Sequence, residues 1–445
     1  ALAGLTGLLW IAGVITAWVQ SLPGPRGGPA QGLQVLAHPL APGHAFGVPG
    51  LSAVVYWSAV IVMLSAIASV SWWIWQIVNR HHQEVVRNPR RRPGTATSHE
   101  VATTASRRAL LKRAGTLRPS LTQPRPRDAG YLIGRAHSRE VWTSVEDSTL
   151  VLGPPRSGKG LHIVINAILD APGPVITTST RPDNLAATIT RRQRQGPVAV
   201  FDPQRLAEGV PAGLRWSPVR GCEDPLVAMI RATGLASATG LSAGGVEGGG
   251  FWEGKTRTAL QTLLHAAALD GRTPRELYAW TLNPSLASDA VSILAGTPGA
   301  AEGWGDSLES MIHADPRTRD SIWMGVSLAL SCLADPRVVD AVSPTDGEHF
   351  DPVDFLANNG TLYLLATGAG AGAAWPLVAA FVEDLVETAR HLAARSPGAR
   401  LDPPLLLALD EIGNLSPLPS LPTLMAEGGG TGITTMPVLQ SLAQA

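Results

Sequence analysis

The fold is decided by the stretch Ser148-Thr-Leu-Val-Leu-Gly153-Pro-Pro-Arg-Ser-Gly158-Lys159-Gly160-Leu-His-Ile-Val-Ile-Asn-Ala-Ile-Leu. An apolar run typical of a buried strand leads into a glycine-rich loop, and a plausible helix follows. Glycines let backbone N–H groups turn inward around a phosphate, and the N-terminus of the next helix adds favourable partial charge. The stretch therefore predicts a nucleotide-binding phosphate loop, in which Lys159 reaches the β- and γ-phosphates. The alternative is a surface turn in a glycine-rich chain.

One position in the loop departs from the usual pattern. Gly160 follows the lysine, where such loops commonly carry a Ser or Thr that offers an oxygen to Mg²⁺. We therefore expect Mg²⁺ to be held by water, by nucleotide oxygens and by an acidic motif, with Ser157 as a nearby candidate. The predicted nucleotide contacts are Gly153, Pro154, Pro155, Arg156, Ser157, Gly158, Lys159, Gly160 and Leu161.

The acidic motif is Leu405-Leu-Leu-Ala-Leu-Asp410-Glu411, an apolar run that ends in two acids. Ligands of α/β sheets bind at the carboxyl ends of the strands. We predict that Asp410 positions Mg²⁺ through water and that Glu411 orients and polarises the attacking water. Gln440 follows another apolar run and is predicted to offer its amide to the γ-phosphate. The alternatives are a helix cap for the acids and a solvated strand end for Gln440.

Further apolar runs alternate with helical stretches, which indicates an α/β fold with a mainly parallel sheet covered on both faces. The predicted strands are Ser148–Leu152, Pro174–Thr178, Val198–Phe201, Thr361–Ala366, Leu405–Leu409 and Gly432–Val438. Between 255 and 345 successive helices are predicted instead, as an all-α insertion: Phe251–Leu269, Pro274–Trp280, Leu286–Leu294, Ala301–His313 and Pro316–Leu333.

Two stretches near the N-terminus contain no charged residue, Ala1–Leu22 and Leu51–Val78. Each exceeds the roughly 20 residues that a transmembrane helix needs, so two spans are predicted. The alternatives are a signal peptide for the first and a buried core helix for the second. Basic residues after the second stretch place the C-terminal part in the cytoplasm by the positive-inside rule. The chain is thus predicted to be a multi-pass protein of the bacterial cytoplasmic membrane.

The charge distribution and the cysteine content say less about function than these motifs do. Formal net charge is zero, but fourteen Arg or Lys and only three acids lie between Arg80 and Arg139. Contact of the first arginines with lipid headgroups is as good an interpretation as contact with nucleic acid. The two cysteines do not indicate a disulfide framework, and His81-His82 is better explained as a solvated pair than as a metal site. Arg181 is a candidate for phosphate or interface contact, although a surface role is the simpler reading.

These features together resemble the TraG/TraD family of type IV coupling proteins. The resemblance rests on the apolar N-terminal stretches, on the phosphate loop with Gly160, and on the acidic motif through Gln440-Ser-Leu-Ala-Gln444. It also rests on four shorter pieces: Val198-Ala-Val-Phe-Asp-Pro203, Trp216-Ser-Pro218, Phe251-Trp-Glu and Thr361-Leu-Tyr-Leu-Leu365.

The resemblance implies a RecA-like P-loop NTPase domain interrupted by the all-α insertion and assembled as a homo-hexamer. It implies that ATP hydrolysis, with Mg²⁺, moves single-stranded DNA and its attached relaxase towards the type IV secretion channel. Lys159, Asp410, Glu411 and Gln440 match the family's nucleotide residues, and the chain looks truncated after Gln444. The alternatives are an FtsK-like double-stranded DNA translocase, a protein-secretion ATPase, and a nucleotide-gated receptor that does not hydrolyse ATP.

The sequence therefore predicts seven regions along the chain. They are a first transmembrane helix (1–22), an extracytoplasmic loop (23–50), a second transmembrane helix (51–78), a basic linker (79–128), the first part of the RecA-like domain (129–254), the all-α insertion (255–345) and the second part of the RecA-like domain (346–445). The Gly-rich Gly240–Gly250 segment is not assigned to a pore because its charge is acidic.

Overall fold

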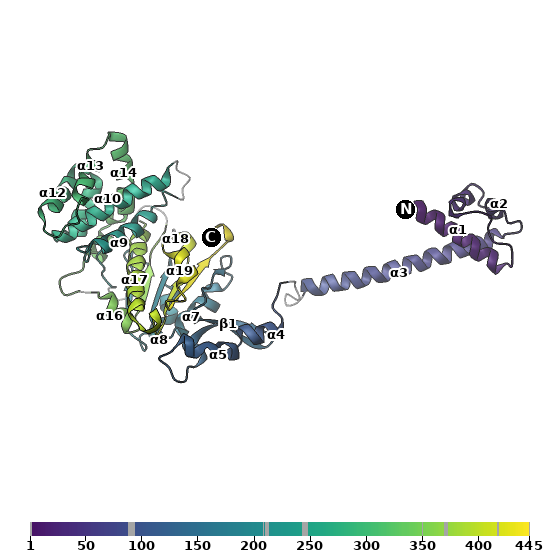
Figure 1. Ribbon diagram of the computed structural model, residues 1–445, viewed down its shortest axis with the longest axis horizontal. Helices are drawn as coiled ribbons and strands as arrows, with labels where there is room; N and C mark the ends of the chain where they lie inside the picture. The colour runs from purple at the N-terminus through teal and green to yellow at the C-terminus, as the bar shows by residue number, and fades with distance from the viewer. Residues whose placement is uncertain are drawn as a thin grey trace. The chain divides into compact units, whose positions relative to one another are not determined.

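The computed structural model describes residues 2–87, 94–207, 209, 213–242, 248–348, 350–368, 373–415 and 418–444. It consists of two compact units, unit 1 (Ala1–Thr97) and unit 2 (Ser98–Ala445), which are described separately below (Figure 1). The arginines of the predicted linker at 90–92 and the centre of the Gly-rich segment at 243–247 lie outside the described residues.

Unit 1 is helical. Its elements are α1 (Leu2–Val19), the 3₁₀ helix η1 (Pro29–Ala37), α2 (Pro42–Phe46) and α3 (Ala53–Arg87). The α1 and α3 helices pack together, and the Tyr56 hydroxyl donates a 3.0 Å hydrogen bond to the Leu9 carbonyl. The buried Phe46 ring covers Gly13, where a Cβ would come within 2.7 Å of the ring. The loop between the two apolar stretches thus folds back onto α1.

Only one of the two predicted membrane spans is supported. Among the described residues, Ala53–Ile77 is long and apolar enough to cross a membrane, and its Trp72, Trp73 and Trp75 are exposed. The first stretch forms a helix of 18 residues, which ends at Val19 because Ser21 turns the chain with a φ of 54°. Within the described residues, the apolar part of this helix is Gly4–Val19, which is shorter than a candidate span. The multi-pass prediction is therefore not supported.

The core of unit 2 is a sheet of six parallel strands in the order β3-β8-β7-β4-β6-β5. This confirms the predicted α/β class with a mainly parallel sheet. All six predicted strands are present: β5 and β7 have the predicted ends, β4, β6 and β8 differ by one residue, and β3 starts three residues later. Their bounds are β3 (Val151–Leu152), β4 (Val175–Ser179), β5 (Val198–Phe201), β6 (Thr361–Leu365), β7 (Leu405–Leu409) and β8 (Ile433–Leu439).

Helices cover both faces of this sheet. Alternate side chains of β7 enter two different cores, because successive residues of a strand point to opposite faces. Leu405, Leu407 and Leu409 pack with α17 (Trp375–Arg395), and Leu406 and Ala408 pack with the helix that follows the phosphate loop. The smaller helices α8 (Asp183–Arg192), α16 (Pro352–Ala357), α18 (Ile412–Leu415) and α19 (Leu421–Glu427) complete the layers.

The second half of the predicted linker is folded. It contains α4 (Ser98–Glu100), the π-helix η3 (Val101–Ala105), α5 (Arg107–Leu117) and α6 (Pro126–Ala129). Ser106 caps α5 by accepting a hydrogen bond from the Ala109 amide, and Leu110 is buried against an antiparallel hairpin that the sequence did not reveal. The hairpin strands are β1 (Gly130–Ala136) and β2 (Arg139–Ser144). The linker therefore ends before residue 98.

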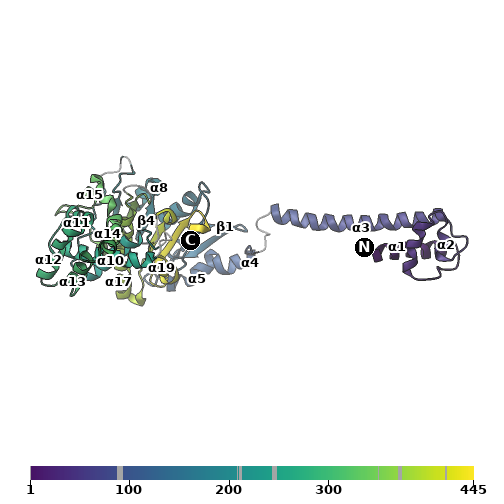
Figure 2. The same ribbon diagram turned by 90° about the horizontal axis from the view of Figure 1, so that it is seen from above.

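The helical part between β5 and β6 starts earlier than predicted, at Pro225 instead of 255. Four of its helices begin with Asp-Pro or Thr-Pro, a pairing in which the first side chain caps the helix and proline fits its first position. Figures 1 and 2 show this part at one end of unit 2, with α4, α5 and β1 at the other. Its elements are α9 (Pro225–Ser237), α10 (Gly249–Leu269), α11 (Pro274–Leu282), η5 (Pro284–Ala287), α12 (Ser288–Gly296), α13 (Trp304–Ile312), α14 (Pro316–Ala329), η6 (Ser331–Ala334) and α15 (Pro336–Ala341).

A buried aromatic cluster joins the sheet to the helical part. Trp216 stacks on Phe381 of α17 with ring centroids 4.5 Å apart, and Phe201 of β5 meets both rings edge-on. Arg231 of α9 lies over the Trp216 ring and forms a 2.9 Å ion pair with Asp384. Two of the short pieces that carry the family resemblance are therefore core residues, and their role here is packing.

Candidate nucleotide site

The phosphate loop connects β3 to a helix of mixed geometry. That helix begins as a π-helical turn, η4 (Gly160–Val164), and continues as α7 (Ile165–Asp170). The Gly153 amide donates a 3.1 Å hydrogen bond to the Leu439 carbonyl, which fixes the start of the loop against β8. Gly158 has a φ of 84°, a left-handed conformation that glycine adopts without strain.

The loop is tight enough that side chains are excluded at its two outer glycines. A Cβ on Gly153 would lie 2.8 Å from Ser157 Oγ, and one on Gly158 would lie 2.7 Å from His162 Cδ2. The Lys159 ammonium group donates a 3.5 Å hydrogen bond to the Pro154 carbonyl across the loop. The Lys159 ammonium group thus lies against the loop, beside glycines whose backbone N–H groups can approach a phosphate.

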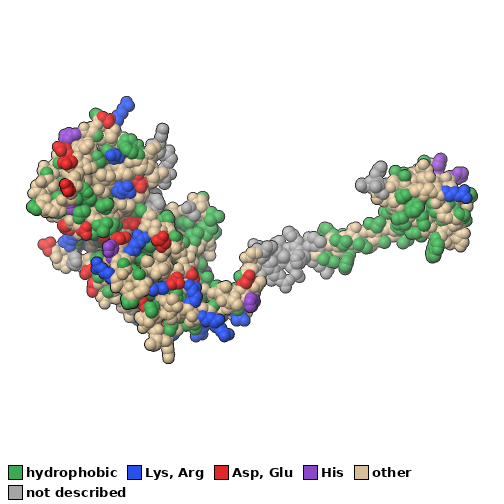
Figure 3. Space-filling view, viewed as in Figure 1, with side chains coloured by type: hydrophobic (Ala, Val, Ile, Leu, Met, Phe, Trp, Pro, Cys, Tyr) green, Lys and Arg blue, Asp and Glu red, His purple; other side chains and the backbone are tan. Residues whose placement is uncertain are grey.

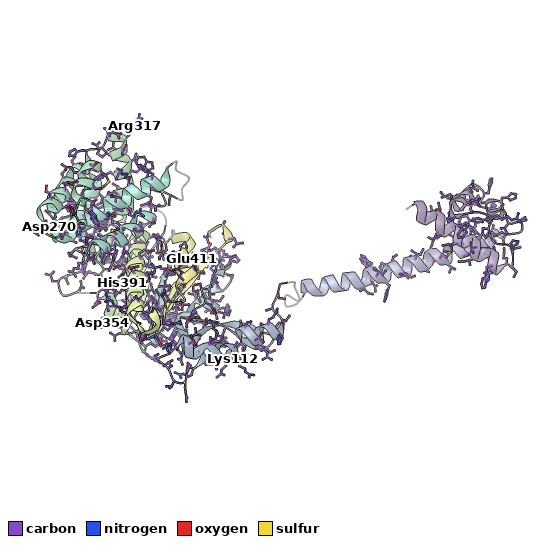
Figure 4. The ribbon with its side chains drawn as sticks, in the orientation of Figure 1. Lys112, Asp270, Arg317, Asp354, His391 and Glu411 are labelled. Atoms are coloured by element: carbon purple, nitrogen blue, oxygen red, sulfur yellow. The ribbon has the colours of Figure 1, made fainter. Side chains whose placement is uncertain are left out.

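The two acids lie at the carboxyl end of β7, as predicted. Asp410 is half-buried, and its carboxylate accepts hydrogen bonds from the Glu411 amide (3.1 Å) and from Asn184 Nδ2 (3.3 Å). The Thr178 hydroxyl at the end of β4 donates to the Asp410 carbonyl at 3.0 Å. Glu411 has a φ of 59°, so the chain turns sharply directly after Asp410. Figure 4 shows Glu411 at this end of the sheet.

The pKa of Asp410 is raised above its ordinary value. Burial contributes most, because it disfavours the ionised form, and the charge of Glu411 adds to the effect. Hydrogen bonds from Asn184 and the Glu411 amide act in the opposite direction, as does the positive charge of Lys159. The lysine of the loop and the acid of β7 are therefore close enough to interact electrostatically. A bound cation would favour the ionised form further.

Gln440, at the end of β8, lies beside the acidic pair. Its side-chain Nε2 donates a 2.9 Å hydrogen bond to Glu411 Oε2, and its backbone N–H donates one of 2.7 Å to Gln444 Oε1. Because β8 lies between β3 and β7 and all three strands run in parallel, their carboxyl ends meet at one edge of the sheet. The strand order therefore brings together all four residues predicted to act on the nucleotide: Lys159, Asp410, Glu411 and Gln440.

The residues present fit a magnesium nucleotide with few protein ligands to the metal. Gly160 supplies no side-chain oxygen, and within the described residues no group of three or more His, Cys, Asp or Glu is arranged to hold a metal ion. Mg²⁺ in nucleotide sites commonly keeps several waters and binds one or two carboxylates together with substrate phosphates. Asp410 provides such a carboxylate. The Ser157 hydroxyl lies close to Gly153, inside the loop.

Arg181 follows β4 at the same edge of the sheet but is not directed at the acids. Its side chain is 75% exposed and pairs with Asp183 at 3.3 Å. This arrangement favours the surface role. Thr178 and Asn184, which hold Asp410, were not singled out from the sequence. The available signal was the polar run that follows β4, Thr177-Thr-Ser-Thr-Arg-Pro-Asp-Asn184, at a strand end next to β7.

We expect Asn184→Ala to weaken binding of the magnesium nucleotide by about tenfold, the effect of losing one hydrogen bond to a charged group of about 1.5 kcal/mol. Without the Asn184 amide the pKa of Asp410 rises further, so the loss should be largest at low pH and shrink as pH increases. Titration of Mg·ATP binding between pH 5.5 and 8 measures this. Thr190→Ala is the control, since Thr190 lies on the same helix and is exposed. An equal, pH-independent loss in both variants would contradict this role for Asn184.

Comparison with known proteins supports the family resemblance. Residues 404–445 match the family model described as the TraM recognition site of TraD and TraG. The matched segment contains β7, β8 and the acidic motif. This confirms the resemblance to type IV coupling proteins, over the segment that contains the acidic motif. The comparison with curated protein sequences finds no match.

The solved structures similar to this chain include coupling proteins. A bacterial conjugative coupling protein, TrwBΔN70 in an unbound monoclinic form, is 19% identical over 68% of this chain and 65% of that chain, with a TM-score of 0.48. The plasmid coupling protein TrwB in complex with ADP and Mg²⁺ is 18% identical over 74% and 70% of the two chains, also with a TM-score of 0.48. This chain thus spans about two thirds of the length of the first of these.

Proposed function

We propose that this chain is the ATPase of a membrane-anchored type IV coupling protein with a RecA-like domain. In this role, ATP hydrolysis drives single-stranded DNA, with an attached relaxase, towards a type IV secretion channel. The observation that carries the proposal is the meeting of the phosphate loop and the acidic pair at one edge of a parallel sheet. Lys159 influences the pKa of Asp410, and Gln440 links β8 to Glu411.

Each residue of the site has a distinct role in this proposal. The backbone N–H groups of 156–160 and the Lys159 ammonium group would bind and orient the phosphates, and Asp410 would hold the hydrated Mg²⁺. The bound magnesium nucleotide supplies a phosphoanhydride whose cleavage releases the free energy for movement. Glu411 accepts a hydrogen bond from the attacking water and orients it, and the Gln440 amide holds the Glu411 carboxylate in place.

The segment matched by the family model is only partly accessible to a partner. Its two strands, β7 and β8, are buried throughout, so they are unavailable to a partner protein. Among the described residues of this segment, those exposed to a partner of the TraM type include residues on α19, Gly430 and residues 441–443 after β8. The partners that we propose for the chain are DNA with its relaxase, secretion-channel components, the membrane, and further copies of this chain in a hexamer.

One alternative keeps a specific observation in its favour. Gly160 provides no hydroxyl to the metal, which suits a nucleotide-gated receptor that binds ATP without hydrolysing it. The ordered contact between Gln440 and Glu411 favours the hydrolase, because a receptor has no need of an oriented carboxylate beside the phosphates. A double-stranded DNA translocase or a protein-secretion ATPase would use the same site and differ only in the polymer.

The proposal predicts that single-stranded DNA raises the rate of ATP hydrolysis by the full chain in lipid nanodiscs. Stimulation should be insensitive to DNA sequence and should fall steeply between 50 and 500 mM salt, because phosphate contacts release counterions. Stimulation by duplex DNA alone would favour the double-stranded translocase. Nucleotide binding without hydrolysis under every condition would contradict the proposal and support the receptor.

A further inference from the structure

Four basic side chains gather at the end of unit 2 that carries α5 and the hairpin. Arg107, Arg108 and Lys112 lie on α5, and Arg139 begins β2; all four are exposed. Within the described part of the chain none of the four forms an ion pair, whereas the neighbouring Arg113 does. We call these four residues the basic patch. Figure 3 shows Lys and Arg side chains clustered over α4 and α5, and Figure 4 labels Lys112 among them.

Three residues of the basic patch, Arg107, Arg108 and Arg139, line a hollow of about 420 Å³ whose lining combines charge with an apolar wall. The wall is Leu111, which is 36% exposed on the same helix. The one acid of the hollow, Glu140, is already engaged, since it accepts a 3.2 Å hydrogen bond from Trp142 and lies 3.8 Å from Arg135. The lining residues are Ser106, Arg107, Arg108, Leu111, Arg139 and Glu140.

This combination fits a phosphate group attached to an apolar body. Guanidinium groups bind phosphate through paired N–H donors, and an exposed leucine between them adds contact for hydrocarbon. A nucleic acid would instead need a continuous basic track, usually with aromatic side chains on which bases stack. The aromatic ring nearest the hollow, Trp142, is only 8% exposed. The chemistry therefore favours an anionic phospholipid over a nucleic acid.

The chain places α5 within reach of a membrane surface. The candidate span ends at Ile77, and α3 continues for ten residues to Arg87, or about 15 Å. From Arg87 to Ser98, where α4 begins, the chain can extend at most about 40 Å. A tether of this length allows the α5 end of unit 2 to reach the membrane surface on the side where α3 emerges. Once there, basic side chains are attracted by anionic lipid over about a Debye length.

We propose that the basic patch binds anionic phospholipid headgroups of the membrane that α3 spans, so that the α5 end of unit 2 docks on the bilayer. The inference rests on α3 crossing the membrane and adds a second contact to that anchor. It is independent of the nucleotide site, because the patch lies on α5 and β2, whereas the catalytic residues lie at the carboxyl ends of β3, β7 and β8.

The test uses the full chain with Thr116→Cys, which places a thiol on exposed α5 beside the patch, labelled with an environment-sensitive fluorophore. The two native cysteines stay unlabelled because Cys222 and Cys332 are buried and burial raises the pKa of each thiol to about 12. In nanodiscs of phosphatidylcholine with 30% phosphatidylglycerol, emission should shift to the blue, and it should return towards its unbound value in 500 mM salt. In nanodiscs of phosphatidylcholine alone no shift is expected.

Charge reversal identifies the residues responsible. Arg107→Glu, Arg108→Glu and Arg139→Glu together should lower the docking equilibrium constant by about a hundredfold, since each basic side chain near an anionic surface contributes about a fivefold attraction. The control Arg194→Glu, Arg257→Glu and Arg317→Glu changes charge equally at exposed sites elsewhere on unit 2 and should dock as the parent does.

Three results would overturn the proposal. They are an equal shift in both kinds of nanodisc, an undiminished shift in the patch variant, and a shift on adding single-stranded DNA with none on adding phosphatidylglycerol. The last would assign the patch to nucleic acid. Failure of the chain to co-elute with nanodiscs would remove the premise that α3 spans the membrane. None of these results bears on ATP hydrolysis, which is measured separately.

Discussion

Glu411→Gln is expected to lower the rate of ATP hydrolysis by about two to four orders of magnitude, the usual contribution of a positioned general base. The amide keeps the size of the side chain but loses the negative charge that polarises the attacking water. Nucleotide affinity should stay within a factor of about three, since Glu411 has no role in holding the phosphates. Release of inorganic phosphate and binding of a fluorescent ATP analogue, measured on the same preparation, separate the two quantities.

Glu427→Gln is the matched control for this variant. Glu427 ends α19 in the same C-terminal segment and is exposed, so hydrolysis should be unchanged. If Glu411→Gln hydrolysed ATP at the parental rate, Glu411 would not orient the water. If the parent chain itself bound ATP without hydrolysing it, the result would favour the nucleotide-gated receptor, in agreement with the missing hydroxyl at Gly160.

Lys159→Ala is expected to reduce both binding and hydrolysis. Hydrogen bonds from a charged donor contribute about 1.5–3 kcal/mol, so nucleotide binding should weaken by about tenfold to a hundredfold. Hydrolysis should fall by a further factor of about a hundred, because the ammonium group also stabilises charge that develops on the phosphates. Equilibrium binding of Mg·ATP and the steady-state rate of ATP hydrolysis measure the two effects.

The fold should tolerate this change. The Lys159 ammonium group makes a single 3.5 Å hydrogen bond within the loop, so thermal stability should remain close to that of the parent. Lys255→Ala is the control, because Lys255 lies on α10 of the helical part, where it contacts Phe251. A Lys159→Ala variant that binds nucleotide as tightly as the parent would place the phosphates elsewhere.

The strands of the sheet could be predicted because each is an apolar run bounded by turn residues. The strand β3 shows the limit, since it starts at Val151 instead of Ser148. The Thr435 carbonyl accepts a hydrogen bond from the Thr149 amide, and the Leu439 carbonyl accepts one from the Gly153 amide. Pro437 lies midway between these two residues of β8, so its backbone also faces β3. Proline has no N–H to donate, and the ladder is interrupted there. That effect depends on which strand pairs with β8, and the local sequence of β3 does not reveal its partner.

In the candidate site, too, some features follow from the local sequence and others depend on the tertiary fold. The phosphate loop and the acidic pair are local motifs, and their placement at strand ends follows from the sequence. The contacts of Asn184 with Asp410 and of Gln440 with Glu411 depend on the order of the strands. The length of the first apolar stretch misled for a different reason, because absence of charge does not show where a helix ends. Ser21 ends it early.

The most direct test of the central claim is the position of the triphosphate in an experimental structure of the chain with Mg²⁺ and a non-hydrolysable ATP analogue. We predict that the phosphates lie against the backbone N–H groups of 156–160, with Lys159 on the terminal phosphate and Glu411 one water away from it. A nucleotide bound away from this loop, or one whose terminal phosphate is out of reach of the acidic pair, would contradict the account.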